Sequence, residues 1–416
     1  MTRSATPDRA IRYRPAVAST GGRAADRARA RRAGELLRWS LVAIHDDEVA
    51  RAPTRATPPA AAGIGDLTER AEYHRLTPIL HSLAGRLPDL DPSVAAALEA
   101  SYHFAVRRHL FVLDDLAWVA AVLDDLTPDV LVIKGPILSA VVYDRADLRS
   151  YGDLDVVVRA DGFARAVELL TDAGATFREP DWNAAVARRL GEVSLALPSG
   201  TVLDLHWHLV PIGTMRDRFT IDMGALFESA RTVAVDGRPY RTLAPEATVV
   251  HLALHAVLCG GDRLGWLEDL HQALRPAAGA APDHGAVLDV ARSWGATGAL
   301  AVQLDRLDRT VGSGARSATG VGPTSASAGL ARVAARAADR LQPPERSTGE
   351  RTAGVTLAWA TAPTVSRSAL ELGRMGTRWV RRQGEVRPER VRDGTEATPP
   401  PTPRQWRDYL ATVGTG

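Results

Sequence analysis

Two aspartates near the middle of the chain have the residue type and the spacing to hold a metal ion. Asp153 and Asp155 flank Leu154 and lead into the apolar run 156–158, which predicts a buried strand. Residues two apart in a strand point to the same side, so both carboxylates face one space. They repel each other there unless a cation lies between them. Carboxylate oxygens of this kind suit hard divalent metals such as Mg²⁺.

A third aspartate stands on another predicted strand. Residues 194–209 have the pattern of a hairpin that turns at 198–200. In its second arm Asp204, His206 and His208 share one face, and apolar residues share the other. An aspartate in such an apolar strand is costly to bury without a partner. A metal ion shared with the first two aspartates would supply that partner.

A lysine precedes these acids in a predicted strand, turn and helix. Leu131–Ile133 is a short apolar run, Gly135 makes the turn, and Pro136–Tyr143 has the length and composition of a short helix. Lys134, between strand and turn, is the single lysine of the chain. A lysine supplies a compact positive charge of the kind that binds phosphate. The alternative is that this lysine is a chance survivor in an arginine-rich chain.

At these residues the chain resembles the uncharacterised nucleotidyltransferases related to the DNA polymerase beta superfamily. The resemblance covers roughly residues 66–309 and rests on Lys134-Gly135, Tyr143, Arg149, Gly152-Asp153-Leu154-Asp155, Asp204-Leu205-His206-Trp207 and, more loosely, residues 251–270. It implies an α+β fold, in which a small mixed β-sheet core is flanked by helices, with helical N-terminal and C-terminal regions. One departure is Gly135-Pro136, where the wider superfamily has a Gly-Ser whose hydroxyl and amide contact phosphate.

The resemblance implies an enzyme that moves an NMP from an NTP to an acceptor hydroxyl and releases pyrophosphate. Asp153, Asp155 and Asp204 would then be the catalytic residues and the ligands of two Mg²⁺ ions, with Mn²⁺ as an alternative. The residues expected to bind nucleotide or phosphate are Lys134, Gly135, Arg149 and Gly152. The acceptor stays open between a small molecule, a peptide and a protein. Two other classes compete: a catalytically degenerate nucleotide-binding protein and a metal-dependent phosphohydrolase.

Several further residues are candidates for positions near the substrate. The candidates are His206, His255, Asp269 and Arg263. His251 and His255 are four apart in a predicted helix and can hold zinc, but the segment lacks the glutamate of a metalloprotease motif. A packed or hydrogen-bonded histidine pair is the favoured interpretation. Arg149 has an alternative role in pairing with Asp144 or Asp147.

Charge and cysteine content limit the possible partners of the protein and its expected location. Residues 1–32 carry nine Arg and two Asp, and residues 374–408 carry nine Arg and five acids, so basic ends flank an acidic middle. Neither end has aromatic residues spaced for base stacking, which favours solvated tails over nucleic-acid binding. The single cysteine, Cys259, resembles a small core residue of a reducing compartment. Without an apolar leader or a spanning segment, we expect a cytoplasmic protein that does not bind membranes.

The order of patterns along the chain predicts five regions. They are a disordered basic tail (1–30), a helical N-terminal region (31–125), the nucleotidyltransferase core (126–240), a helical region beside the active site (241–310), and a linker with a partly helical, Pro/Arg-rich tail (311–416).

Overall fold

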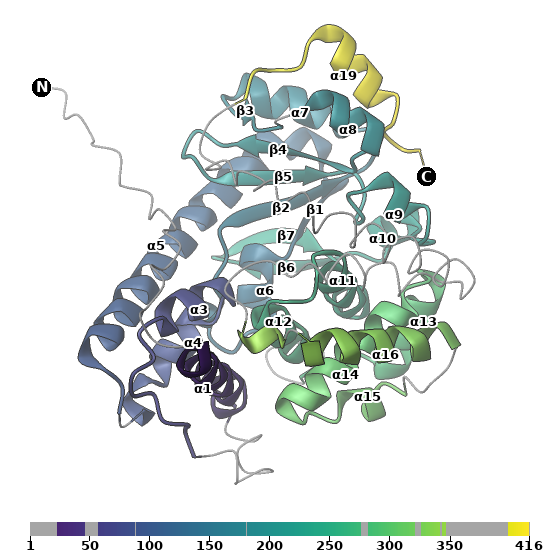
Figure 1. Cartoon of the computed structure of the whole chain (residues 1–416). Helices are drawn as coiled ribbons and strands as arrows, with labels where there is room; N and C mark the ends of the chain where they lie inside the picture. Colours follow the sequence, from purple (N-terminus) through teal and green to yellow (C-terminus); the bar gives the residue numbers. More distant parts are fainter. Residues whose placement is uncertain are drawn as a thin grey trace, which may run out of the picture.

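The sheet at the centre of the molecule is mixed and has helices on both faces (Figure 1). The computed structural model describes residues 23–45, 57–87, 89–179, 181–275, 282–320, 326–341, 343–346 and 398–415. The five strands are β1 (Val130–Ile133), β2 (Asp153–Val158), β3 (Thr176–Phe177), β4 (Glu192–Ala196) and β5 (Val202–His206). Their order is β1-β2-β5-β4-β3, with β2 parallel to β5 and every other pair antiparallel. The α+β class and the small mixed sheet are confirmed.

The helices that precede the sheet pack below it in the view of Figure 1, except for the long α5, which runs along its side. These elements are α1 (Arg23–Ala43), α3 (Leu67–Tyr73), α4 (Thr77–Ser82), η2 (Ala84–Arg86), α5 (Pro92–Val122) and η3 (Asp124–Leu126). Asp91 caps α5, since its side chain accepts a hydrogen bond from the backbone of Ser93. Asp89 and Asp91 have the same spacing as Asp153 and Asp155, but they precede a helix and do not lie on a strand.

The remaining helices interleave with the strands and then form a bundle after them. Within the sheet region lie α6 (Gly135–Val141), η4 (Ala146–Leu148), α7 (Phe163–Asp172), α8 (Trp182–Arg188), α9 (Gly213–Arg216), α10 (Met223–Glu228) and the separate hairpin of β6 (Arg231–Val235) and β7 (Arg238–Thr242). After it come α11 (Pro245–Leu258), α12 (Leu264–Leu274), α13 (His284–Ser293), α14 (Thr297–Val311), α15 (Ala315–Ala318), α16 (Ala326–Leu341), η5 (Pro344–Arg346) and α19 (Pro403–Leu410).

Alternation along the strands divides the interior into two hydrophobic cores. Leu154 and Val156 of β2 face one core, which α5, α7 and α8 complete. Leu131, Ile133 and Val157 face the other core, which contains α1, α4, α11, α12 and α14. Because Asp153 and Asp155 alternate with Leu154, they point to the side of α11 and α12. The second core therefore provides the helices that close over the acids.

The described segments near the two ends of the chain are helical. Helix α1 begins at Arg23, inside the predicted tail 1–30, because Leu36, Leu37 and Leu41 anchor it in the core and its Arg/Ala-rich first turns continue the helix. For residues 23–30 the expectation of a disordered tail was wrong. Near the other end, α19 packs on α8, where the Tyr409 ring contacts the Trp182 ring. The Tyr409 hydroxyl donates to the carbonyl oxygens of residues 190 and 192, at 3.0 and 3.1 Å. This helix lies within the tail 311–416, which was expected to be partly helical.

Two further sequence patterns have different outcomes. The composition of residues 369–382 predicts a helix, but this segment lies outside the described residues. Leu98, Leu110 and Leu116 recur at helical spacing, which predicts one buried stripe on α5; Leu98 and Leu116 are buried, whereas Leu110 is exposed. No helix in the described part of the chain is long and apolar enough to cross a membrane.

Candidate functional site

The parallel pair of β2 and β5 brings the predicted acids to one face of the sheet. Asp155 lies directly opposite Asp204 in the register of the two strands, and Asp153 lies opposite Val202. Residues paired in register on neighbouring strands point to the same side. The neighbouring strand β4 adds Ser194 opposite Asp204. Three carboxylates from two separate strands therefore share the sheet face that was predicted for them.

Asp155 is the centre of a buried chain of charged groups. Its Oδ1 lies 2.5 Å from Lys134 Nζ and 3.2 Å from His206 Nε2, and His206 Nδ1 lies 2.9 Å from a Glu192 carboxylate oxygen. Burial alone would raise the pKa of Asp155, but Lys134 and His206 hold it well below its usual value. Burial also opposes charge on His206, yet Glu192 and Asp155 raise its pKa to about 10. Asp155 is thus an anion between two cations.

Asp204 lies beside this chain but makes a different contact. Its Oδ1 accepts a hydrogen bond from the Ser194 hydroxyl. Burial raises the pKa of Asp204 to about 7, and the nearby Glu192 and Asp155 add to the effect. The carboxyl of Asp204 is therefore easier to protonate than that of Asp155.

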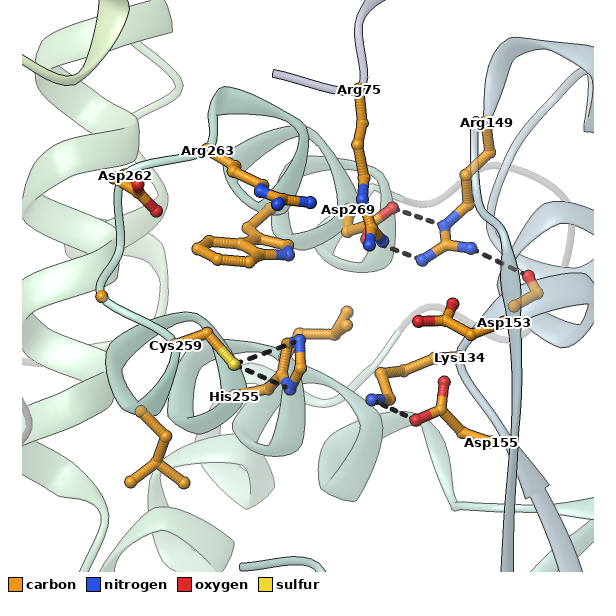
Figure 2. Close-up of a pocket in the computed structure, with 15 residues that line it drawn as sticks. Arg75, Lys134, Arg149, Asp153, Asp155, His255, Cys259, Asp262, Arg263 and Asp269 are labelled. Carbon is orange, nitrogen blue, oxygen red and sulfur yellow. Dashed lines mark hydrogen bonds and ion pairs between the residues drawn. The ribbon is translucent and has the colours of Figure 1, made fainter. Parts of the chain in front are cut away.

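A cavity of about 460 Å³ opens in front of Asp153 and Asp155 (Figure 2). This volume is in the range of small-molecule sites. Its lining combines charged side chains from the sheet and the helices with a few apolar ones: Arg75, Lys134, Gly135, Arg149, Asp153, Asp155, Leu252, His255, Leu258, Cys259, Gly260, Asp262, Arg263, Trp266 and Asp269. Asp204 and His206 are not part of this lining and lie behind Asp155.

The turn after β1 holds Lys134 in a strained backbone. Lys134 has φ 53° and ψ −140°, a conformation that costs a residue with a side chain of the order of 1–3 kcal/mol. Gly135 follows with φ 35°, and a Cβ there would lie 3.4 Å from the Asp153 carbonyl oxygen. The close approach of the turn to β2 explains the glycine. Strain of this kind is concentrated at functional sites, and here it directs the only lysine to Asp155.

Arg149 joins the sheet side of the cavity to α12. Its Nε and Nη2 donate to the two oxygens of Asp269 at 2.7 and 2.9 Å, and its Nη1 donates to the Gly135 carbonyl oxygen at 3.0 Å. The Tyr143 hydroxyl also donates to Asp269, at 2.7 Å. The alternative pairing of Arg149 with Asp144 or Asp147 is therefore wrong. It failed because the true partner is 120 positions away in the chain.

The helix side of the cavity carries His255, Cys259, Arg263 and Trp266. The Arg263 guanidinium lies over the Tyr73 and Trp266 rings, with its carbon 5.3 and 5.6 Å from their centroids. Burial lowers the pKa of His255 well below its usual value, and Lys134 adds to the effect, so this imidazole is neutral. Cys259 Sγ lies 3.7 Å from His255 Nδ1. Cys259 is exposed and lines the cavity, so its assignment to the core was wrong.

The two histidines of α11 pack against each other. The His251 and His255 rings lie 6.1 Å apart, and His251 is buried. Burial lowers the pKa of His251 to about 3. Among the described residues, no three His, Cys, Asp or Glu side chains are grouped as ligands of one ion. The packed pair favoured by the sequence agrees with this arrangement.

The structure gathers most of the residues selected from the sequence and adds others. Lys134, Gly135, Arg149, Asp153, Asp155, His255 and Asp269 line the cavity. Gly152 does not, and its carbonyl oxygen accepts a hydrogen bond from Arg108. The sequence reasoning missed Glu192, which contacts His206, and Arg75, which enters the cavity from the turn between α3 and α4. Arg75 stands in no motif, and one arginine among 51 basic residues gives no local signal.

The chemistry of the acids fits a divalent metal, although they are not a preassembled ligand set. Asp153 and Asp155 present oxygen donors to the cavity from one face of β2. Burial and the acidic neighbours Glu192 and Asp155 raise the pKa of Asp204, and a cation bound nearby would favour its charged form. In the chain as described, Lys134 and His206 are the cations that contact Asp155.

A mixed sheet with paired aspartates on one strand and a third aspartate on the neighbouring parallel strand is the arrangement that the resemblance to nucleotidyltransferases predicted. The chain belongs to the family described as uncharacterised nucleotidyltransferases, whose model matches residues 60–310. The match covers more than half of the chain and confirms the resemblance. Nucleotidyltransferase activity in general, with an NTP as substrate, follows from this family. A search of curated proteins gives no match.

Proposed function

We propose that this protein transfers an NMP from an NTP to an acceptor hydroxyl with the help of divalent metal ions, and releases pyrophosphate. The observation that carries the proposal is the convergence of Asp153, Asp155 and Lys134 on one wall of a single cavity. These three residues belong to the motifs on which the family resemblance rests, and Lys134 is the only lysine of the chain. Asp204, on the same face, adds the third carboxylate.

Asp153 and Asp155 would hold the metal at the cavity, with Asp204 behind them. When bound, divalent ions favour ionisation of the acceptor hydroxyl and neutralise charge that develops on the phosphates. Lys134 contributes a fixed positive charge on the same side. The pair of Arg149 and Asp269 holds Gly135, and therefore the turn that carries Lys134, in place.

A nucleotide-binding protein without turnover is the second candidate. It is favoured by Pro136, which lacks the hydroxyl and the amide of the usual serine, and by the contact of Lys134 with Asp155. Both observations concern the same wall of the cavity. The experiment for the first proposal distinguishes the two.

The test is to incubate the purified protein with each α-labelled NTP, with Mg²⁺ or Mn²⁺, in extract from its own cells. We expect one extract component to acquire label while pyrophosphate is released. Asp153→Asn should lower this rate about 10³-fold because it removes a metal ligand. The matched control is Asp289→Asn on α13, an aspartate whose side chain is 74% exposed, and it should keep the parent rate.

Three outcomes would contradict the proposal. An Asp153→Asn protein as fast as the parent would remove the role of the acids. Free phosphate or NMP without a labelled adduct would indicate a phosphohydrolase. NTP binding measured by calorimetry, without release of pyrophosphate from any extract, would indicate the second candidate.

A further inference from the structure

Arg75 reaches the cavity from a part of the chain far from the acidic motifs. It lies in the turn between α3 and α4, and its side chain points toward Asp153 and Arg149 in Figure 2. The nearest motif residue in the chain, Lys134, is 59 positions later. The N-terminal helices therefore contribute one long basic side chain to a site that the sheet otherwise dominates.

The backbone at Arg75 is fixed by contacts with the start of α12. The His74 carbonyl oxygen accepts a hydrogen bond from Gly265 N at 2.9 Å, and His74 Nδ1 accepts one from Leu264 N at 3.2 Å. A Cβ on Gly265 would lie only 2.7 Å from the His74 oxygen and 3.1 Å from Arg75 Cβ. Arg75 itself has φ 58°, in the left-handed region that costs a residue with a side chain about 1 kcal/mol or more. The side chain is thus presented from a strained and tightly held turn.

The Arg75 head group has no acidic partner, unlike its neighbours. Within the described part of the chain its guanidinium makes no hydrogen bond and no ion pair, and Figure 2 draws none. Arg149 is held by Asp269 and Lys134 by Asp155, whereas Arg263 rests on aromatic rings. A partly buried charge without a partner is unfavourable. Burial lowers the pKa of Arg75, although Asp153 opposes the shift, as expected for a cation without a counter-ion in contact.

The charge of the cavity favours an anion with several charges. Four basic and four acidic side chains line it, so its formal charges balance before any metal binds. Divalent ions at Asp153 and Asp155 would leave the cavity positive, with Arg75 and Arg263 as the cations that have no carboxylate in contact. A planar guanidinium matches phosphate oxygens in a two-point geometry. A single carboxylate would not offset this surplus, whereas a polyphosphate would.

We propose that Arg75 binds the terminal phosphates of the nucleotide, the part that leaves as pyrophosphate, and that Arg263 flanks it. The identity of the anion rests on the proposed function, whereas the anion site itself rests on the fixed, unpaired guanidinium. In this role Arg75 contacts the leaving group and not the α-phosphorus that is attacked. It holds the β- and γ-phosphates on the far side of the cavity from Lys134.

The test measures binding of inorganic tripolyphosphate by calorimetry in the presence of Mg²⁺, the condition in which the cavity would carry a positive surplus; a parent protein that does not bind it would also overturn the inference. We expect Arg75→Gln to weaken binding about tenfold to hundredfold, and Arg75→Lys to weaken it less because the charge remains. The matched control is Arg165→Gln on α7, which belongs to the other core and has a side chain that is 55% exposed; it should bind within about twofold of the parent. Unchanged binding in Arg75→Gln would overturn the inference.

A nucleotide series identifies which phosphates Arg75 contacts. Its replacement by glutamine should weaken binding of ATP most, of ADP less and of AMP hardly at all. An equal loss for AMP would place the contact at the α-phosphate or the nucleoside and overturn the assignment to the terminal phosphates. If the variant does not fold, phenylglyoxal modification of the parent protein, followed by mass spectrometry, replaces it. Tripolyphosphate should slow modification of Arg75, and an unchanged rate would refute the contact.

The two proposals can fail separately. If no extract component acquires label but tripolyphosphate binding depends on Arg75, nucleotidyl transfer is contradicted and the anion site is supported. If transfer occurs and Arg75→Gln leaves the affinities for tripolyphosphate and NTP unchanged, only the role of Arg75 is contradicted.

Discussion

The cavity has a sheet wall, with Lys134, Asp153 and Asp155, and a helix wall, with Arg75 and Arg263. The two walls differ in how their charges are compensated. On the sheet wall, Lys134 and Asp155 neutralise each other at 2.5 Å, and His206 joins them from behind. On the helix wall, Arg75 and Arg263 have no carboxylate in contact within the described residues. On the first wall the cation has a carboxylate in contact, whereas on the second wall neither arginine has one. A metal has to compete with a lysine at the first wall, and an anion finds an open cation at the second.

The largest effect should come from removing the lysine of the sheet wall. Lys134→Met leaves the buried Asp155 without its nearest cation, and breaking one side of a buried pair typically costs about 3–5 kcal/mol. If Asp153 and Asp155 bind a divalent ion, Mg²⁺ should recover much of this loss in the variant and stabilise the parent less. Urea unfolding with and without Mg²⁺ measures both effects.

The control for this prediction is an exposed pair on α13. Arg292→Met breaks the contact of Arg292 with Asp289, both of which are more than half exposed, and should change the free energy of unfolding by less than about 1 kcal/mol. It should show no additional dependence on Mg²⁺. Equal stabilisation of Lys134→Met and the parent by Mg²⁺ would mean that the lysine and the metal do not share Asp155.

A smaller effect is expected at the contact that holds the helix wall. Gly265→Ala would place a Cβ 2.7 Å from the His74 carbonyl oxygen and displace the turn that carries Arg75. We expect a loss of about 1–3 kcal/mol in the free energy of unfolding, together with weaker binding of tripolyphosphate. Urea unfolding and calorimetry are the two measurements.

The matched control is another helical glycine. Gly329, in α16, has nothing within 4 Å of the position of a Cβ, so Gly329→Ala should stabilise the protein by about 0.4–1 kcal/mol. It should leave tripolyphosphate binding unchanged. A Gly265→Ala protein that behaved like this control would show that the Arg75 turn is not held by α12.

The same contrast explains what the sequence could predict. The sheet wall is built from short contiguous segments, and each carries its own signal. Asp153 and Asp155 are two apart on a strand, and Asp204 lies within a hairpin pattern. Their common face follows from alternation in parallel strands, which the register confirms. The mixed sheet, the long helix α5 and the family were predictable for the same reason.

The helix wall was less predictable because its contacts join distant segments. Asp269 pairs with Arg149 across 120 positions, and Arg75 meets the cavity from a turn that hydrogen bonds to the start of α12 through His74. Neither has a periodic or local pattern. Cys259 was misplaced for a related reason, since α11 ends next to the double glycine and leaves the residue at the cavity edge. Composition also misled for residues 23–30, where packing of Leu36 in the core orders the helix that this arginine-rich segment begins.

The smallest predicted effect concerns two histidines on the sheet side. His206, between Glu192 and Asp155, has its pKa raised to about 10, whereas burial, with Arg216 adding, lowers the pKa of His208 to about 3. Folding keeps His208 neutral, so below pH 6.5 the unfolded chain binds a proton that the folded one does not. The free energy of unfolding therefore falls as pH drops from about 6.5 toward 3.

The variant that tests this is His208→Asn, because asparagine can still accept the hydrogen bond from Val210 N. Between pH 7 and 5 its free energy of unfolding should fall by about 2 kcal/mol less than that of the parent. Urea unfolding at both pH values measures this difference, with His103→Asn, at an exposed position on α5, as the control that keeps the parent slope. An unchanged slope in His208→Asn would mean that this imidazole accepts a proton in the folded protein, and that the sheet side is more open to water than its burial indicates.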